Sequence, residues 1–434
     1  MKILVVGAGL AGLTCARLLH KAGQEVVVLE AADGVGGRVR SDQIDGYTCD
    51  RGFQVLFDGY PAARRQLDLT ELELRAFDPG ALICRNGQRS ILTDPLRDRQ
   101  LKDVIAAIRT PEIPLLDKLR TLRLVLALGW SGRDPQRFGE QSTIAFLQAQ
   151  GFTQATIDRF FRPFYGGIFL ERPLATTAAA FAFYFEMLAR GNTVIPAAGM
   201  GAITEQLAAP LAAAGAIRLN TSVESLRYSG DRVSGVRLRD GQELDADAVV
   251  LATDAPAAHR LVDMPTPAGA RQTVAIYFAG RRPVYQGKKI MLNANADAFV
   301  NNAQQLSAVA PECAPEGRHL LSATILGTPA GDDRELVGRA MRDLRRMWAG
   351  DAGALAALDT YYPLKVYRIT YAQFDQPPGI SSRLPGNQAA HADGTPIPGL
   401  YIAAEWTEAS SINGAILSGE QCATLVQNEQ SLPA

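Results

Sequence analysis

The 434-residue sequence has little of what disulfide-linked, metal-binding or membrane-spanning proteins need. Its five cysteines are widely spaced and include no C-x-x-C pair, and its four histidines are equally scattered. We therefore expect no disulfide framework and no metal site, and a reducing compartment such as the cytoplasm. No apolar run reaches the 18 or so residues that a spanning helix needs, and the first residues lack the charged and apolar regions of a signal peptide.

A surplus of charge of either sign is also missing. The 44 lysines and arginines almost balance the 45 aspartates and glutamates, which leaves a net charge of −1. Without a basic surplus to neutralise phosphates, we expect no nucleic-acid partner. Apolar residues make up 47% of the chain, and its length exceeds what one ordinary core holds, so we expect a globular protein of two domains.

The N-terminal residues 2–30, "KILVVGAGLAGLTCARLLHKAGQEVVVLE", are typical of a strand–helix–strand unit. Gly7, Gly9 and Gly12 form a G-x-G-x-x-G motif between the first strand and the helix. Gly7 permits a tight turn, Gly9 lets backbone approach a pyrophosphate, and Gly12 lets the helix pack on the strand. Glu30 ends the second strand, where a carboxylate can accept the ribose hydroxyls of an adenosine.

The next stretch, "EAADGVGGRVRS" at residues 30–41, contains a second glycine pair and an arginine. A nicotinamide-only enzyme does not require G-G-R at this distance from the acidic residue. Gly36 and Gly37 let the loop pass close beneath a cofactor, and Arg38 can place its planar donors on the pyrophosphate. A dinucleotide with this further loop contact is therefore predicted.

Together these motifs resemble the N-terminal signature of the flavin-dependent amine oxidase superfamily, which includes phytoene and carotene desaturases and protoporphyrinogen oxidases. The similarity continues through residues 45–52, 195–208, 220–226 and 399–423. It implies an α/β fold in which a Rossmann-like FAD-binding domain, with a parallel sheet of glutathione-reductase-type topology, adjoins a substrate domain of mixed sheet and helices.

The resemblance also implies a division of the chain. The FAD-binding domain is expected at 1–90, 195–265 and 385–434, and the substrate or lid domain at 91–194 and 266–384. It implies cofactor contacts for Gly7, Ala8, Gly9, Ala11, Gly12, Glu30, Ala31, Gly36, Gly37, Arg38, Gly52, Phe53, Gly199, Met200, Val223, Glu405, Ile412, Asn413 and Ala415.

The C-terminal block has a physical interpretation of its own. Glu405 ends a predicted strand at the carboxyl edge of the sheet, where ligands of open α/β folds bind. The helix that follows places amides near Ile412–Ala415, which can face an electron-rich flavin carbonyl. Relatives that tether flavin use a cysteine upstream of this block, and residues 366–379 contain none. The FAD is therefore expected to be noncovalent.

The sequence constrains the reaction less than it constrains the cofactor. Amine oxidases of the superfamily usually have a lysine near flavin N5 and a tyrosine before the last helix, and alignment places Thr273 and Ser411 there. Lys288 and Lys289 follow in a predicted turn, where we interpret them as surface charges. These departures weigh against oxidation of an amine.

Aromatic residues cluster at 160–174 and 179–188. An aromatic, charge-poor pocket suits a polyene or a tetrapyrrole, although such stripes are more often plain core, and both interpretations stay open. Residues 361–373 resemble the segment that precedes the flavin loop in desaturases. The candidate pocket residues are Phe164, Tyr165, Tyr184, Tyr362 and Tyr367.

We predict an FAD-dependent oxidoreductase that passes hydride from a C–H bond of a small hydrophobic substrate to flavin, with oxygen or a quinone as acceptor. No catalytic acid or base is identified. The alternatives are an amine oxidase, a protoporphyrinogen oxidase-like enzyme, a flavin-binding protein without turnover and a nicotinamide-only dehydrogenase. Residues 113–130 mix leucines with basic residues, which predicts either a lid helix or peripheral contact of a cytoplasmic protein with a membrane.

Overall fold

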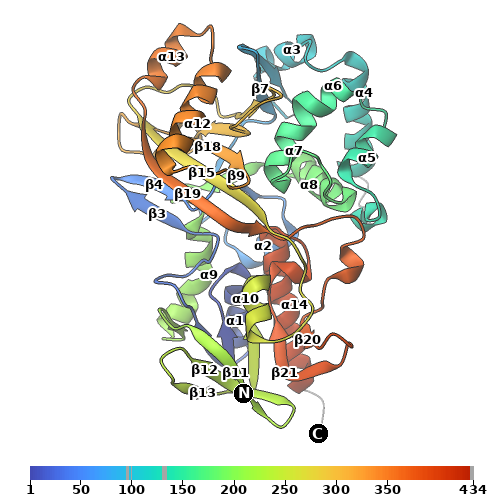
Figure 1. The fold of residues 1–434 in the computed structure, drawn as a ribbon, viewed down its shortest axis with the longest axis vertical. Helices are drawn as coiled ribbons and strands as arrows, with labels where there is room; N and C mark the ends of the chain where they lie inside the picture. The colour runs from blue at the N-terminus through green and yellow to red at the C-terminus, as the bar shows by residue number, and fades with distance from the viewer. Residues whose placement is uncertain (94–96, 99, 130–133, 431–434) are drawn as a thin grey trace.

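The computed structural model describes residues 1–93, 97–98, 100–129 and 134–430. A six-stranded sheet forms one half of the molecule (Figure 1), and its strands are parallel except for the last edge strand. In spatial order they are β10 (Ile217–Arg218), β2 (Glu25–Leu29), β1 (Lys2–Val6), β14 (Ala248–Leu251), β21 (Pro396–Ile402) and β20 (Gln388–Ala390).

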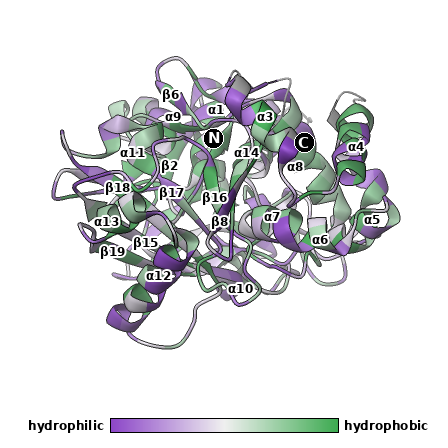
Figure 2. Cartoon of the chain, turned by 90° about the horizontal axis from the view of Figure 1, so that it is seen from above, coloured by the Kyte–Doolittle hydropathy of each residue, from purple (hydrophilic) through white to green (hydrophobic). Residues whose placement is uncertain are grey.

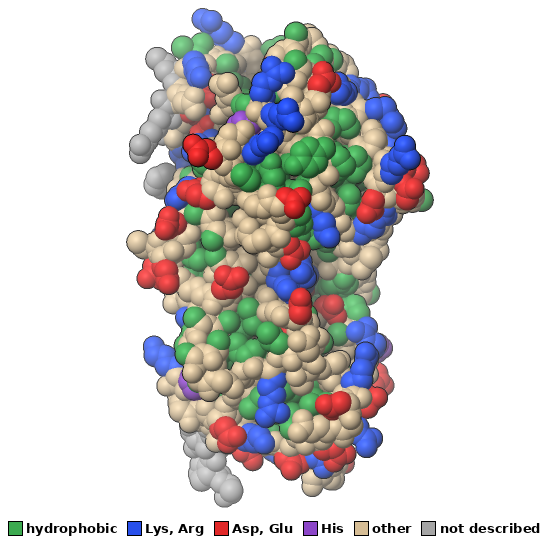
Figure 3. Space-filling view, turned by 90° about the vertical axis from the view of Figure 1, so that its left-hand side faces the viewer, with side chains coloured by type: hydrophobic (Ala, Val, Ile, Leu, Met, Phe, Trp, Pro, Cys, Tyr) green, Lys and Arg blue, Asp and Glu red, His purple; other side chains and the backbone are tan. Residues whose placement is uncertain are grey.

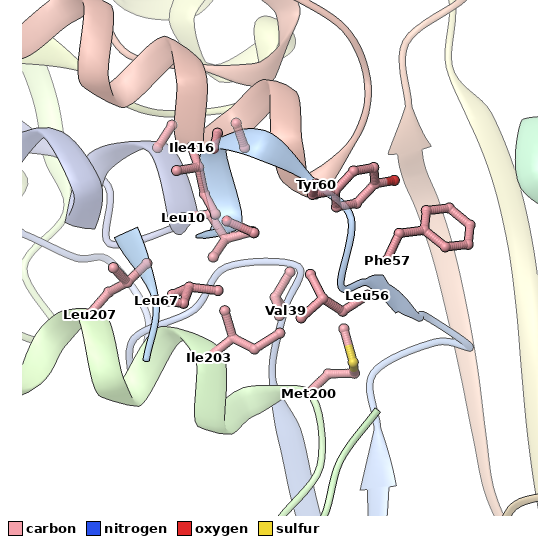
Figure 4. Packing of buried hydrophobic residues seen from close by; sticks show 14 of the residues in the cluster. Leu10, Val39, Leu56, Phe57, Tyr60, Leu67, Met200, Ile203, Leu207 and Ile416 are labelled. Atoms are coloured by element: carbon pink, nitrogen blue, oxygen red, sulfur yellow. The ribbon is translucent and has the colours of Figure 1, made fainter. Parts of the chain in front are cut away.

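Both faces of this sheet are covered, which explains why its central strands are continuously apolar. Helices pack on one face, and Figure 4 shows Leu10, Ile203, Leu207 and Ile416 from these helices converging in one cluster. The helices are α1 (Leu10–Lys21), α9 (Gly201–Ala213) and α14 (Ile412–Gln430). The other face carries β11 (Val223–Ser229), β12 (Arg232–Leu238), β13 (Glu243–Asp245) and α10 (Ala255–Leu261).

A seven-stranded mixed sheet forms the centre of the other half. Its spatial order is β19 (Tyr362–Gln373), β15 (Arg271–Gly280), β18 (His319–Leu326), β17 (Asn302–Gln305), β16 (Ile290–Asn293), β7 (Ala81–Arg85) and β8 (Gln88–Leu92). Helices α12 (Asp333–Met347) and α13 (Ala352–Leu358) bury Val274, Ile276 and Phe278 on one face. Ala275, Tyr277 and Ala279 alternate onto the opposite face and join the large core that also contains α1 and α14.

Helices between residues 101 and 190 lie beside the second sheet (Figure 1). They are α3 (Leu101–Arg109), α4 (Leu115–Leu124), the π-helical turn η1 (Val125–Gly129), α5 (Thr143–Ala149), α6 (Gln154–Thr156), a second π-helical turn (Ile157–Phe161), α7 (Arg162–Phe169) and α8 (Ala178–Arg190). Short strands and one helix link the halves: β3 (Ser41–Ile44), β4 (Tyr47–Asp50), β5 (Leu56–Phe57), α2 (Pro61–Gln66), β6 (Leu74–Ala76) and β9 (Thr193–Pro196). On the face shown in Figure 3, acidic and basic side chains are interspersed.

The predicted α/β class, with one parallel sheet and one mixed sheet, is confirmed. The predicted division at residue 90 does not follow the sheets, because β7 pairs with β16 and therefore places residues 81–92 in the second sheet. The sequence could not show this pairing, which joins strands about 200 residues apart. The predicted domains include some residues outside the described ones: 94–96, 99, 130–133 and 431–434. Trp130 is also the last residue of the predicted amphipathic helix.

Candidate functional site

A cavity of about 1440 Å³ is lined by residues of both sheets and of the helices around them. Its lining includes the loop after β1, the end of β2, the start of α14 and parts of α3, α4, α7 and α8. The volume exceeds the roughly 300–1,000 Å³ that is typical of a site for one small molecule. The cavity therefore has room for a dinucleotide and a second ligand.

Glycines at the end of β1 shape one wall. Gly7 has a φ of +111°, and a Cβ there would lie 2.5 Å from the carbonyl oxygen of Ala252. A Cβ at Gly12 would lie 2.2 Å from the carbonyl oxygen of Gly7. Gly9 has no atom within 4 Å of its would-be Cβ and lines the cavity. Gly7 and Gly12 thus permit the close strand–helix contact, and Gly9 leaves space for a ligand.

Glu30 follows β2 and is held by backbone amides. Its Oε2 accepts a hydrogen bond from Ala8 N at 2.7 Å, and its Oε1 accepts one from Ala32 N at 2.8 Å. Each carboxylate oxygen has a further lone pair, and Glu30 lines the cavity. The carboxylate is therefore fixed where it can accept additional hydrogen bonds from ribose hydroxyls.

Substitution of Glu30 by Ala is expected to weaken FAD binding by about tenfold or more, because hydrogen bonds to a charged group contribute about 1.5–3 kcal/mol. Titration of the apoprotein with FAD, followed by flavin fluorescence, measures the change. Glu25→Ala is the matched control, since Glu25 is exposed at the other end of the same strand. Equal affinity of the Glu30→Ala variant and the wild type would contradict the assignment.

Arg38 joins two distant segments at the cavity wall. Its guanidinium lies 2.5 Å from Glu405 Oε2 and donates to the carbonyl oxygen of Ala372 at 3.0 Å. Its side chain is 34% exposed, and it lines the cavity. Burial lowers the pKa of Arg38, but the Glu405 carboxylate more than offsets this effect, so the pKa is raised and the charge is retained.

One carboxylate oxygen of Glu405 is not used in the contact with Arg38. Its Oε1 is buried and has no hydrogen-bond partner in the described part of the chain. A buried carboxylate oxygen needs a donor, and a ligand hydroxyl in the cavity would supply one. An arginine for phosphate, a fixed carboxylate at Glu30 and an open acceptor at Glu405 fit FAD, which carries a pyrophosphate and two sets of hydroxyls.

The predicted cofactor residues divide into two groups. Those that line the cavity are Gly7, Gly9, Ala11, Glu30, Ala31, Gly36, Gly37, Arg38, Gly52, Phe53, Val223, Glu405, Ile412 and Ala415. Those that do not are Ala8, Gly12, Gly199, Met200 and Asn413. The second group supports the wall from behind: Met200 N donates to Asp50, and Asn413 Oδ1 accepts from Ala62 N at 3.0 Å, which links α14 to α2.

The aromatic residues also divide. Phe164, Tyr165 and Tyr184 line the cavity, whereas Phe161 and Phe181 are buried core residues outside its lining. The Tyr184 hydroxyl donates to the carbonyl oxygen of Ser410 at 3.0 Å, and burial raises its pKa. It therefore remains protonated at neutral pH. The pocket interpretation of the aromatic stripe thus applies to the first three residues, and the core interpretation applies to Phe161 and Phe181.

Tyr362 and Tyr367 are not brought into the cavity lining. Tyr362 is 49% exposed, and the Tyr367 hydroxyl donates to Asp42 Oδ2 at 2.7 Å. Ile369 and Gln373, further along β19, line the cavity instead. The cavity ends before the two tyrosines, and the sequence carries no signal for where along a strand a cavity ends.

Three neutral polar residues from adjacent strands line the cavity: Thr273 of β15, Asn302 of β17 and Thr324 of β18. The Thr273 hydroxyl donates to the carbonyl oxygen of Ile325 at 2.9 Å, and Asn302 Nδ2 lies 3.4 Å from Thr324 Oγ1. Ser411, at the other predicted point of departure from amine oxidases, also lines the cavity. The sequence analysis did not predict Asn302 and Thr324 as lining residues. The available signal was that each is a polar residue within a buried strand.

The surface interpretation of Lys289 is wrong, whereas Lys288 is exposed as predicted. Lys289 is 1% exposed, and its Nζ lies 2.8 Å from Asp98 Oδ2 and 2.8 Å from Asp103 Oδ2. Asp103 lies in the first turn of α3, so this ion triad fastens α3 to the start of β16. Val104 and Ala107 of α3 line the cavity, so the triad supports one of its walls.

Within the described residues, no group of three or more His, Cys, Asp or Glu side chains is placed to hold a metal ion. The five cysteines are free and buried. None of the helices in the described part of the chain combines the length and the apolarity needed to cross a bilayer.

Comparison with known proteins extends these observations. A phytoene dehydrogenase from Streptomyces griseus is 29% identical over 286 residues, which is 60% of this chain and 55% of that protein. A lysine-specific histone demethylase 1B from Mus musculus is 30% identical over 264 residues, 57% of this chain and 29% of that protein. The chain thus spans about half the length of these relatives or less. The structure of cyclohexylamine oxidase from Brevibacterium oxydans IH-35A superposes with a TM-score of 0.68 at 17% identity, covering 99% of each chain, which shows the shared fold.

The sequence model of one family, described as flavin containing amine oxidoreductase, matches residues 10–427. This range includes Gly12, the third glycine of the first loop, the residues around Glu30 and Arg38, and the start of α14. The chain therefore belongs to the flavin containing amine oxidoreductase family.

Proposed function

We propose that the protein binds FAD noncovalently and oxidises a C–H bond of a small hydrophobic substrate. The observation that carries this proposal is the chemistry of the cavity beyond the cofactor residues. Of the carboxylates in its described lining, Asp78 alone lies away from the six-stranded sheet and the segments packed on it. Asp78 accepts hydrogen bonds from Gln100 Nε2 at 3.3 Å and Lys288 N at 3.2 Å. An ammonium substrate would need a carboxylate partner, whereas an aromatic wall suits a polyene.

The roles of the residues follow from their positions. Bound flavin supplies the hydride acceptor. Glu30 and Arg38 hold and orient the dinucleotide, while Phe164, Tyr165 and Tyr184 exclude water and position an apolar substrate. Thr273 and Asn302 present neutral polar groups, so neither of these two side chains is charged to transfer a proton. Desaturation passes a hydride from one carbon to the flavin and releases a proton from the neighbouring carbon. Once the hydride has left, this proton is strongly acidic, so a neutral acceptor such as an amide oxygen or solvent takes it, and positioning is the main requirement.

Similarity to a phytoene dehydrogenase, which extends over 60% of the chain, supports a desaturase-like substrate. Oxygen or a quinone is proposed as the electron acceptor, and the cytoplasm, with peripheral contact to a membrane, as the location. The absence of a cysteine from 366–379 supports noncovalent attachment.

The visible spectrum of the purified protein tests the proposal first. A two-band flavin spectrum is expected, and heat denaturation should release the colour into the supernatant. Under anaerobic conditions a polyene in detergent is expected to bleach the flavin, whereas cyclohexylamine and putrescine should not. Bleaching by the amines alone would replace this proposal with amine oxidation. A flavin reduced by neither class would favour binding without turnover.

A further inference from the structure

Helix α4 and the turn η1 present leucines to solvent. The exposed side chains are Leu115 (69%), Leu116 (56%), Leu119 (57%), Leu122 (48%) and Leu126 (65%), which we call the leucine face. Four of these positions are spaced by four, three and four residues and so form one helical stripe. Asp117, Leu124 and Leu128 are buried on the other side. The helix thus packs against the protein with its inner side and exposes an apolar stripe to solvent. An exposed apolar stripe of this kind marks an interaction surface.

The exposed charged side chains within residues 100–129 have one sign. The carboxylates within residues 100–129 are all in ion pairs: Asp103 with Lys289, Glu112 with Arg85 and Arg159, and Asp117 with Arg120. Lys102, Arg109 and Arg123 are exposed. This surface is positive on a chain whose net charge is −1, so it complements an anionic partner.

The leucine face is continuous with the cavity. Leu119 and Leu122 line the cavity and are also exposed, so the cavity opens at this face. Lys118, Thr121 and Val125 also belong to this part of the lining. Figures 1 and 2 both show α4 at the outer edge of the molecule. An apolar ligand leaving this opening would pass directly over exposed leucines.

We propose that the leucine face docks on the surface of an anionic lipid bilayer and that the hydrophobic substrate enters the cavity from the acyl region beneath it. The docking rests on the exposed leucines and cations alone, and the direction of entry rests on the proposed function. A basic helix with leucines on one side lies in the interface of a bilayer, where the apolar side chains are buried and the cations contact phosphates. A second copy of the chain is a poorer occupant, because its cations would face those of the first.

Sedimentation of the flavin-loaded protein with vesicles tests the docking. Binding is expected to vesicles of phosphatidylcholine and phosphatidylserine, and it should weaken as salt is raised. The variant Leu115→Glu/Leu126→Glu alters two leucines that do not line the cavity, and its partition is expected to fall by at least about tenfold. Leu219→Glu is the matched control, since Leu219 is 39% exposed elsewhere on the molecule. Retained flavin absorbance confirms that each variant is folded.

The experiments distinguish failure of the docking proposal from failure of the proposed entry route for the substrate. If the wild type does not sediment with these vesicles, or if the double variant sediments equally well, the docking proposal is wrong. A dimer that the double variant abolishes would assign the face to a second copy instead. Flavin bleaching by a polyene in detergent should be unchanged in the double variant, whereas bleaching by the same polyene in vesicles should be slowed. If both rates are equal in variant and wild type, substrate does not enter from the bilayer.

Discussion

Substitution of Arg38 by Ala is expected to remove most of the FAD from the purified protein. Arg38 is the cavity-lining cation that both pairs with Glu405 and follows the Gly36–Gly37 turn. A charge-assisted contact between guanidinium and phosphate contributes about 1.5–3 kcal/mol, which corresponds to a loss of about 10- to 150-fold in affinity. The ratio of flavin to protein absorbance gives the occupancy, and titration of the apoprotein with FAD gives the dissociation constant.

The same substitution leaves Glu405 buried without its partner, so stability has to be separated from binding. Glu405 is 5% exposed, and thermal unfolding of the apoprotein measures the destabilisation. Arg38→Lys keeps the positive charge but lacks the planar fork, and we expect it to bind FAD with intermediate affinity. Full flavin occupancy in a folded Arg38→Ala variant would show that the pyrophosphate lies elsewhere.

The features that the sequence predicted well are those determined by neighbouring residues. The turn at Gly7, the contact at Gly12 and the strand end at Glu30 depend on local conformation and on side-chain size, which short motifs record. Arg38 was predicted as a phosphate ligand from its motif, but its pairing with Glu405 joins residues more than 360 positions apart. The local geometry at the glycines and at Glu30 could therefore be predicted, and the contacts between distant segments could not.

The substrate side depends on long-range packing, for which single residues give little signal. Tyr362 and Tyr367 lie on the strand that reaches the cavity, yet the cavity ends before them. Asn302 and Thr324 meet only because β17 pairs with β18. The leucine face of α4 has the periodicity of a buried stripe, but its leucines are exposed. Amphipathic periodicity shows that a helix has two sides, and tertiary packing decides which side faces the core.

Lys288 and Lys289 are adjacent in the sequence, but Lys288 is exposed and Lys289 is buried. Substitution of each lysine should therefore change the free energy of unfolding by very different amounts. Lys289→Met is expected to lower the free energy of unfolding by about 3–5 kcal/mol, because Asp98 and Asp103 would remain as buried carboxylates without their cation. Lys288→Met should change it by less than about 0.5 kcal/mol, since Lys288 is exposed. Urea unfolding of the apoprotein at pH 7 measures both. A Lys289→Met variant within about 1 kcal/mol of the wild type would contradict the burial of the triad.

The pH dependence of this difference gives an independent check. Burial raises the pKa of Asp98, but hydrogen bonds from Lys289 and Thr93 more than offset this, so the pKa is lowered. A carboxyl group whose pKa is lower in the folded state stabilises the fold fully above its unfolded pKa of about 3.9, and this contribution is lost as the pH falls through the folded value. In Lys289→Met, Asp98 keeps the burial that raises its pKa and loses the lysine that lowers it, so it takes up a proton at a higher pH than in the wild type. The gap between the wild type and Lys289→Met should therefore be largest near pH 8 and narrow as the pH falls toward 4. Adding Asp98→Asn and Asp103→Asn to Lys289→Met removes the unpaired charges, and we expect it to restore part of the lost stability at pH 7.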